Sequence, residues 1–174
     1  MPYRTVPAIG QLHDNSCWAA CLAWFLKAQP GGRPSWTQAR AIQEYERATD
    51  SDTGALRDEA VLKGWRSDTR LKMATMLFET PDPELADLPL GTRPVCIAFR
   101  HLTGFAHMNV IWRAEDTGYI QCMEPFWPFP GTDGKRTGRF VKRTFEHFNF
   151  GDRVVLAWAR PANGGTSQMP SDVG

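Results

Sequence analysis

A cysteine at the start of an apolar segment is the residue of this chain best suited to nucleophilic chemistry. Three good N-cap residues, Asp14-Asn15-Ser16, precede Cys17, and the segment from Cys17 to Leu26 is rich in Ala and Leu and apolar on every side. We therefore predict a buried helix that begins at Cys17. The N–H groups and the dipole at a helix N-terminus favour the thiolate, which is the reactive form of cysteine. The alternative is that Cys17 is a small apolar residue of a core helix.

Two neighbours of this cysteine fit the same chemistry. Gln11 stands six residues upstream, at the end of an extended segment that we expect to fold back beside the helix start. Its side-chain amide, together with the backbone N–H of Cys17, would then donate two hydrogen bonds to a developing oxyanion. Trp18 follows the cysteine directly. We predict that Trp18 packs in the core and lines the substrate-binding site.

The string QLHDNSCW, residues 11–18, resembles the active-site segment of papain-like cysteine peptidases. In that family the glutamine helps to form the oxyanion hole and the cysteine heads the central helix. The resemblance implies a histidine on a downstream strand, and His107 lies near the start of an apolar run after Gly104. Short bacterial members carry an Asp-Pro pair after the next turn. This chain has Glu124-Pro125 there, so the resemblance implies that Glu124 orients the histidine.

The resemblance covers roughly residues 8–27 and 90–126 and is strongest to compact bacterial forms, such as bacteriocin-processing peptidase domains and translocated effector peptidases. It implies a peptidase, acting as a bacterial effector or toxin, that cleaves peptide bonds through a Cys-His-Glu triad. The same site also suits a thiol-dependent deamidase or acyltransferase. Two further hypotheses are a catalytically inactive papain-like module that binds peptides and an unrelated α+β binding domain. Asn109 is a weaker candidate for the orienting role, since it lies two residues from His107 on the same strand.

An unusually aromatic sequence, Phe126-Trp127-Pro128-Phe129-Pro130, follows Glu124 directly. We predict that Phe126 and Trp127 contact the substrate as a lid or shelf. The alternative is that these rings pack across the end of the cleft.

Helices come first and strands follow, which is typical of an α+β fold with a mainly antiparallel sheet. We predict one papain-like domain over residues 1–160 and a flexible, Gly- and Ser-rich tail over 161–174. Residues 65–90 contain Pro81, Pro83 and Pro89, and we assign much of this segment to a loop. The helices are predicted at 17–26, 35–47 and 54–63, with Gly64 as a C-cap, and the strands at 95–99, 105–112, 119–123, 139–145 and 153–159.

The net charge and the apolar runs of the chain limit the classes of partner and location that we expect. The net charge of +1 gives no electrostatic reason to expect nucleic acid or an anionic membrane surface, so the expected partner is a protein or peptide substrate. No apolar run approaches the roughly 20 residues of a membrane span, and the N-terminus lacks the apolar core of a signal peptide. We therefore expect a cytoplasmic protein, or one exported by a machinery that needs no signal peptide.

The number and spacing of the cysteines favour neither disulfide bonds nor a metal site. The four cysteines are too few for a disulfide scaffold, and we expect all of them to be reduced. Cys17 and Cys21 have a spacing that zinc could use, but no second close Cys or His pair accompanies them. The sequence therefore predicts no metal and no cofactor.

Overall fold

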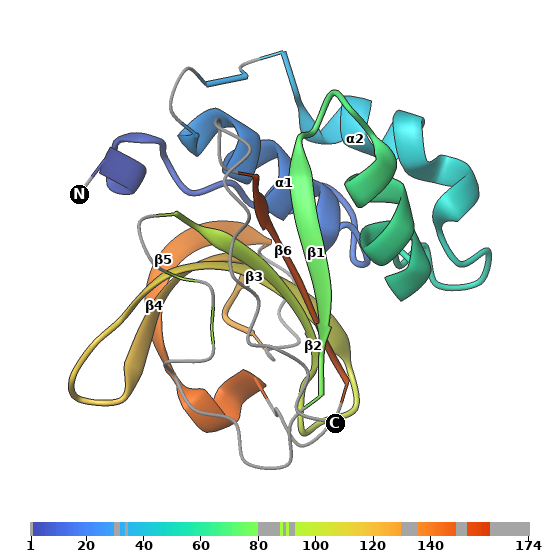
Figure 1. The fold of residues 1–174 in the computed structure, drawn as a ribbon. Helices are drawn as coiled ribbons and strands as arrows, with labels where there is room; N and C mark the ends of the chain where they lie inside the picture. The colour runs from blue at the N-terminus through green and yellow to red at the C-terminus, as the bar shows by residue number, and fades with distance from the viewer. Residues whose placement is uncertain are drawn as a thin grey trace, which may run out of the picture.

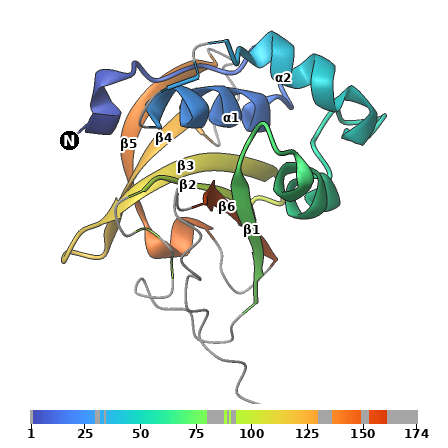
Figure 2. The same ribbon diagram turned by 45° about the horizontal axis from the view of Figure 1, so that its top comes forward.

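A curved antiparallel sheet carries the main helices on one face, so the arrangement is α+β, as predicted (Figure 1). The computed structural model describes residues 2–29, 32–33, 35–79, 88, 90, 93–129, 136–148 and 153–160. The tail predicted over 161–174 lies outside these residues. Figure 2 shows α1 and α2 lying together above the sheet, while the short helix η5 (Phe145–Phe148) lies on its other side.

The central helix begins at the predicted residue. α1 (Cys17–Ala28) buries every residue from Trp18 to Leu26, which explains why this segment is apolar on all sides. α2 (Gln38–Tyr45) starts three residues later than predicted. Its N-cap is Thr37, whose hydroxyl accepts the N–H of Arg40 at 3.2 Å. Two 3₁₀ helices, η1 (Pro2–Thr5) and η2 (Glu46–Ala48), flank this part of the chain.

The third helical segment differs from the prediction. It contains a π-helix, η3 (Ala60–Trp65), and Gly64 lies inside it rather than capping it. The reason is Trp65, which is fully buried with its ring 6.4 Å from that of Tyr45. Burying a large side chain gains about 2 kcal/mol or more, whereas a glycine inside a helix costs about 1 kcal/mol at most. The helix therefore continues through Gly64.

The sheet has six strands in the order β1-β6-β2-β3-β4-β5, with all neighbours antiparallel. The first strand was missed, because much of residues 65–90 was assigned to a loop. Its residues, MATMLF, have little β-branching, and its partner β6 lies about 80 residues further along the chain, so local patterns do not indicate it. The strands are β1 (Met73–Phe78), β2 (Val95–Arg100), β3 (Ala106–Ala114), β4 (Tyr119–Trp127), β5 (Thr137–Thr144) and β6 (Val154–Ala159).

Alternation along the strands builds a separate core on each face of the sheet. On β3, Met108 and Val110 belong to the core that contains α1, whereas Ile111 belongs to the core that contains Phe148 of η5. His107 and Asn109 alternate with the residues that face α1. His107 and Asn109 are therefore surrounded by buried residues, because both faces of β3 are covered.

Two glycines let the N-terminal lead-in approach β5. A Cβ on Gly10 would lie 1.9 Å from the carbonyl oxygen of Arg136, and one on Gly138 would lie 2.2 Å from the carbonyl carbon of Ile9. Next to this contact, the N–H of Gln11 donates to the carbonyl of Pro125 at 2.9 Å. The close approach therefore fixes the segment before the nucleophile against the strand that carries Glu124.

Gly10→Ala should lower the free energy of unfolding by about 2 kcal/mol or more, because backbone atoms cannot yield to the added methyl group as a flexible side chain would. Gly64→Ala is the matched control, since its Cβ would meet Ala60 and Tyr45 only at 4.0 Å. We expect Gly64→Ala to be neutral or to stabilise by about 0.5–1 kcal/mol. Urea denaturation of both variants measures the difference, and equal stabilities would contradict the close approach.

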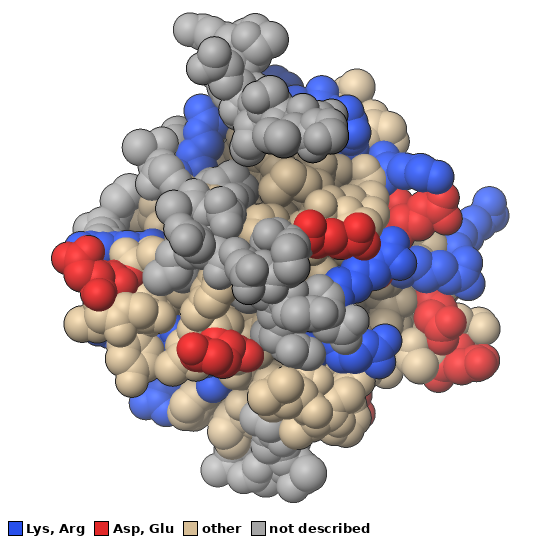
Figure 3. Space-filling view, turned by 60° about the horizontal axis from the view of Figure 1, so that its bottom comes forward, with Lys and Arg blue, Asp and Glu red and all other residues tan. Residues whose placement is uncertain are grey.

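The outer surface mixes charges of both signs. Figure 3 shows Lys and Arg interspersed with Asp and Glu on one face of the molecule. In β5, Lys142 pairs with Glu115 at 2.8 Å and Arg143 turns inward to Glu124. Among the described residues, none of the helices is long and apolar enough to cross a membrane.

Candidate active site

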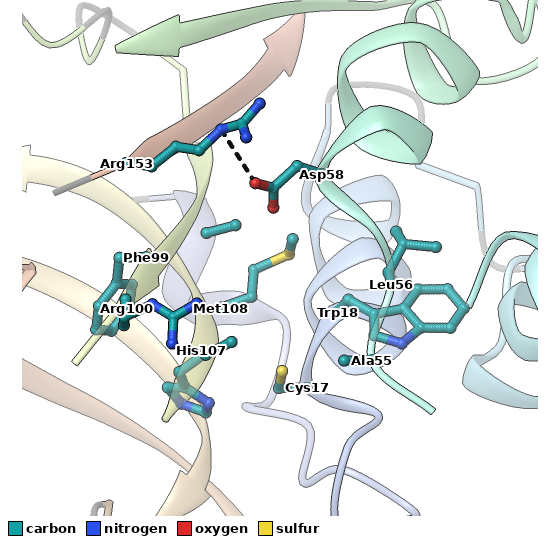
Figure 4. Close-up of a pocket in the computed structure, with 12 residues that line it drawn as sticks. Cys17, Trp18, Ala55, Leu56, Asp58, Phe99, Arg100, His107, Met108 and Arg153 are labelled. Carbon is teal, nitrogen blue, oxygen red and sulfur yellow. Dashed lines mark ion pairs between the residues drawn. The ribbon is translucent and has the colours of Figure 1, made fainter. Parts of the chain in front are cut away.

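Cys17 lies at the edge of a cavity of about 270 Å³ between the start of α1 and the strands β2 and β3. Figure 4 shows Cys17 and His107 close together at one end of this cavity, with the ion pair of Asp58 and Arg153 at the other. Cys17 is half-buried, whereas the other three cysteines are buried, and all four are free. Burial raises the pKa of the Cys21, Cys96 and Cys122 thiols, so these three stay protonated and unreactive.

The helix start beside Cys17 has no side-chain cap. The hydroxyl of Ser16, the N-cap residue, accepts the N–H of His13 at 2.8 Å and donates to the His13 carbonyl at 3.0 Å. It therefore braces the preceding turn instead of accepting the first N–H groups of α1. Those groups, including the N–H of Cys17, remain directed at whatever negative charge develops at the helix start.

His107 links Cys17 to Glu124. Its Nε2 lies 2.6 Å from Oε1 of Glu124, and Cys17 lies near the ring at the same end of the cavity, where it helps to raise the pKa of His107 (Figure 4). Since Nε2 faces the carboxylate, Nδ1 is the ring nitrogen left for the sulfur. The ring of Phe129 stacks on the imidazole with centroids 3.8 Å apart, and Phe99 meets it edge-on at 5.9 Å. These contacts fix the plane of the imidazole.

Glu124 is fully buried and held by donors on both oxygens. Besides His107, Oε1 accepts the backbone N–H of Phe126 at 2.9 Å. Oε2 accepts Nδ2 of Asn109 and a guanidinium nitrogen of Arg143, both at 3.1 Å. Asn109, the weaker candidate for orienting His107, thus contacts the carboxylate, while Glu124 contacts the ring itself. The glutamate side chain is long enough to reach from β4 to His107 on the neighbouring strand β3.

The charges of this network support one another. Burial by itself would lower the pKa of His107, but the charge of Glu124, the hydrogen bond to Glu124 and the nearby Cys17 outweigh it and raise that pKa to about 9. Burial would likewise raise the pKa of Glu124, but the charge and hydrogen bond of His107, the N–H of Phe126 and the charge of Arg143 lower it. At neutral pH the pair is therefore an imidazolium beside a carboxylate.

Gln11 is buried close to the turn that precedes Cys17, and its amide is bonded to that turn. Nε2 donates to the carbonyl oxygens of His13 at 2.8 Å and Asp14 at 2.6 Å, and Oε1 has no partner among the described residues. Arg136 holds the same turn from outside, through the carbonyl of Leu12 and the carboxylate of Asp14. In this structure the amide of Gln11 braces the turn, and its role as an oxyanion donor stays a prediction.

Gln11→Ala tests whether the amide also acts during turnover. Loss of an oxyanion donor lowers kcat by about a hundredfold or more, whereas loss of the bonds to the turn lowers stability by about 1 kcal/mol each. We expect both effects. Steady-state kinetics and urea denaturation separate them, and an unchanged kcat would remove Gln11 from the chemistry and leave it a structural role.

Of the three residues predicted to bind substrate, one lines the cavity beside Cys17 and two do not. Trp18 is buried in the core, as predicted, packs edge-on against Tyr45 at 6.3 Å and lines the cavity beside Cys17, while its contact with substrate stays a prediction. Phe126 and Trp127 do not line that cavity. Trp127 instead lies under the guanidinium groups of Arg139 and Arg143, at 5.3 and 5.4 Å. Contact of these two residues with the substrate outside this cavity stays a prediction.

Sequence reasoning missed several residues that build the site. Phe129 was noted as part of an aromatic run, yet its stacking on His107 depends on the path of the chain after Trp127. Arg143 stands beside Lys142 in a polar segment, and nothing in the sequence indicates that it reaches the site. Only the pairing of β5 with β4 shows that it turns toward Glu124. The spacing of Asp58 and Arg153, almost a hundred residues apart, carries no signal of their ion pair at 3.3 Å.

Comparison with known proteins identifies no family for this chain. The sequence matches no protein-family model and no curated protein. The structure is similar to the crystal structure of the Pseudomonas avirulence protein AvrPphB, with a TM-score of 0.43 and 8% sequence identity, over 91% of this chain and 100% of that one.

Proposed function

We propose that this protein is a papain-like cysteine peptidase in which Cys17, His107 and Glu124 form the catalytic triad. One observation carries the proposal: the half-buried thiol lies at a helix start, lines a cavity, and lies near an imidazole whose Nε2 is 2.6 Å from a buried carboxylate (Figure 4). Nucleophile, base and orienting group are thus connected in the order that thiol hydrolysis needs. A buried thiol of ordinary structural use has no need of such partners.

The proposed mechanism follows from the hydrogen bonds. His107, as imidazolium, donates Nδ1–H to the thiolate of Cys17, which attacks the substrate carbonyl. The N–H groups at the start of α1 stabilise the oxyanion, and the amide of Gln11 joins them if it leaves the carbonyls of His13 and Asp14 during turnover. The imidazolium then protonates the leaving amine, and the neutral ring takes a proton from water, which releases the acyl group from sulfur. Glu124 keeps Nε2–H bound throughout and stabilises the positive charge that His107 carries.

The cavity indicates the size of substrate group that the site accepts. Its volume of about 270 Å³ is at the small end of ligand pockets, which suits one side chain rather than a folded domain. Trp18, Met108 and Leu56 give it an apolar lining, and the exposed pair of Asp58 and Arg153 closes the far end. We propose that a peptide lies across the cavity with one apolar side chain inserted.

The proposal is tested with a mixture of synthetic peptides followed by mass spectrometry. Cleavage produces new peptide termini, and these should be absent with Cys17→Ala. Products of unchanged length that have lost an amide, or that carry a new amine, would identify the deamidase or acyltransferase alternative, because acyl-enzyme formation is common to all three. His13→Ala serves as the control, since His13 is exposed and precedes the nucleophile without taking part in the triad. Identical peptide patterns with the unmodified protein and Cys17→Ala would favour the inactive binding module.

A further inference from the structure

A second cavity lies at the opposite end of α1. It has a volume of about 850 Å³ and is bounded by Leu26 and Gln29 at the end of that helix, by the turn before β1 and by the end of β6. Cys17 and this cavity are separated by the length of the helix, about 18 Å for twelve residues. The volume is within the range of small-molecule sites, and none of the proposed catalytic residues lines it.

The lining of this cavity is strongly basic. The one acidic residue in this lining, Asp68, forms an ion pair with Arg70, whose guanidinium lies 2.7 Å away. Within the described part of the chain, no carboxylate is paired with any of the five cationic residues. These are Arg33, Arg66, Lys72, Arg93 and Arg160.

Three of the guanidinium groups are held in place by backbone carbonyls. Arg33 donates to the carbonyl of Arg70. Arg93 donates to the carbonyls of Ala159 at 3.2 Å and Arg160 at 2.7 Å. Arg160 donates to those of Met73 and Arg66, both at 2.8 Å. Carbonyls orient these groups but do not neutralise them. A ligand would therefore meet charged donors that are already positioned, which reduces the entropy lost on binding.

The electrostatic balance favours an anion. The C-terminus of α1 contributes only about half a negative charge, against five positive side chains. Like charges gathered within about one Debye length of 8–10 Å repel one another, and the repulsion is relieved by a counter-charge. The whole chain has a net charge of only +1, so this concentration of positive charge is local.

We propose that this cavity binds a soluble anion that carries two or more phosphate groups. Guanidinium groups match phosphate oxygens with paired hydrogen bonds, and several cations around one cavity suit several phosphates rather than a single carboxylate. The site is independent of the triad. Because the ligand would contact the end of α1, the turn before β1 and the end of β6 together, its binding stabilises the folded chain.

Sodium tripolyphosphate is the probe, and the variant Cys17→Ala is used throughout so that binding is measured without turnover. Isothermal titration should show one saturable site that weakens as salt is raised. The double variant Arg66→Gln/Lys72→Asn should reduce the affinity by at least about tenfold, since each lost charge removes a charge-assisted contact. Neither side chain makes a hydrogen bond to another described residue, and asparagine tolerates the positive φ of 53° at Lys72.

The control double variant is Arg47→Gln/Arg113→Gln, which removes the same charge from exposed positions outside the cavity. It should bind tripolyphosphate as the parent does. Equal loss in both double variants, or weak binding that does not saturate, would overturn the proposal. Cosedimentation with phosphoinositide-containing vesicles separates a lipid headgroup from a free polyphosphate, and vesicle binding without saturable tripolyphosphate binding would also contradict it.

Discussion

Replacing His107 with alanine should lower turnover by about a thousandfold or more and should also abolish selective alkylation of Cys17. Both effects have one cause, because His107 is the proposed partner that holds the thiolate and later transfers the proton. An ordinary thiol with a pKa near 8.5 is under about 1% thiolate at pH 6, whereas one lowered to about 5 is roughly 90% thiolate. The weaker nucleophilicity of a low-pKa thiolate offsets part of this difference, which leaves an advantage of about tenfold.

The measurement uses a limiting amount of iodoacetamide at pH 6 and maps the modified cysteine by peptide mass. In the native protein Cys17 should react about tenfold faster than a cysteine of the denatured chain, whereas Cys21, Cys96 and Cys122 should stay unmodified because they are buried. His13→Ala should leave this pattern intact. If Cys17 of the native protein reacts no faster than the denatured control, the thiol is not an activated nucleophile and the peptide-binding alternative takes precedence.

Local sequence signals were sufficient for the elements that carry the site. The N-cap residues before Cys17 and the apolar run after it predicted α1, and its first residue is the predicted one. The short apolar runs predicted the strands around β3, and Gly104 and Gly118 turn the chain between them with positive φ values of 88° and 80°. These features depend on neighbouring residues only, which is why a single sequence reveals them.

The features that were missed depend on contacts between distant segments. β1 has no pattern of its own and is defined by its pairing with β6. The amide of Gln11 was expected to face Cys17, but two carbonyls of its own turn lie closer and take its hydrogens. Phe126 and Trp127 were expected at the cavity, whereas Phe129 is the ring that contacts His107. Local aromatic content indicates that a ring will be buried, and only the chain path decides which one reaches the site.

The charge on Glu124 should be visible in the pH dependence of the protein. The folded-state pKa of His107, about 9, lies above its ordinary value of 6.5, so the imidazolium contributes stability that is fully present below about pH 6.5 and is lost as the pH rises to 9. The same ionisation should give kcat/KM an alkaline limb near pH 9, because the neutral ring cannot protonate the leaving amine.

Glu124→Gln should therefore move that alkaline limb to lower pH by about one unit or more and reduce kcat by about tenfold to a hundredfold. Without the carboxylate, burial dominates and disfavours the imidazolium, although the amide oxygen still accepts Nε2–H and keeps the ring in place. Glu115→Gln is the matched control, because Glu115 pairs with Lys142 at the far end of the hairpin. Its pH profile should be that of the unmodified protein. A merely structural role for Glu124 would lower the amount of active protein but leave the limb at pH 9, and this result would exclude Glu124 from the triad.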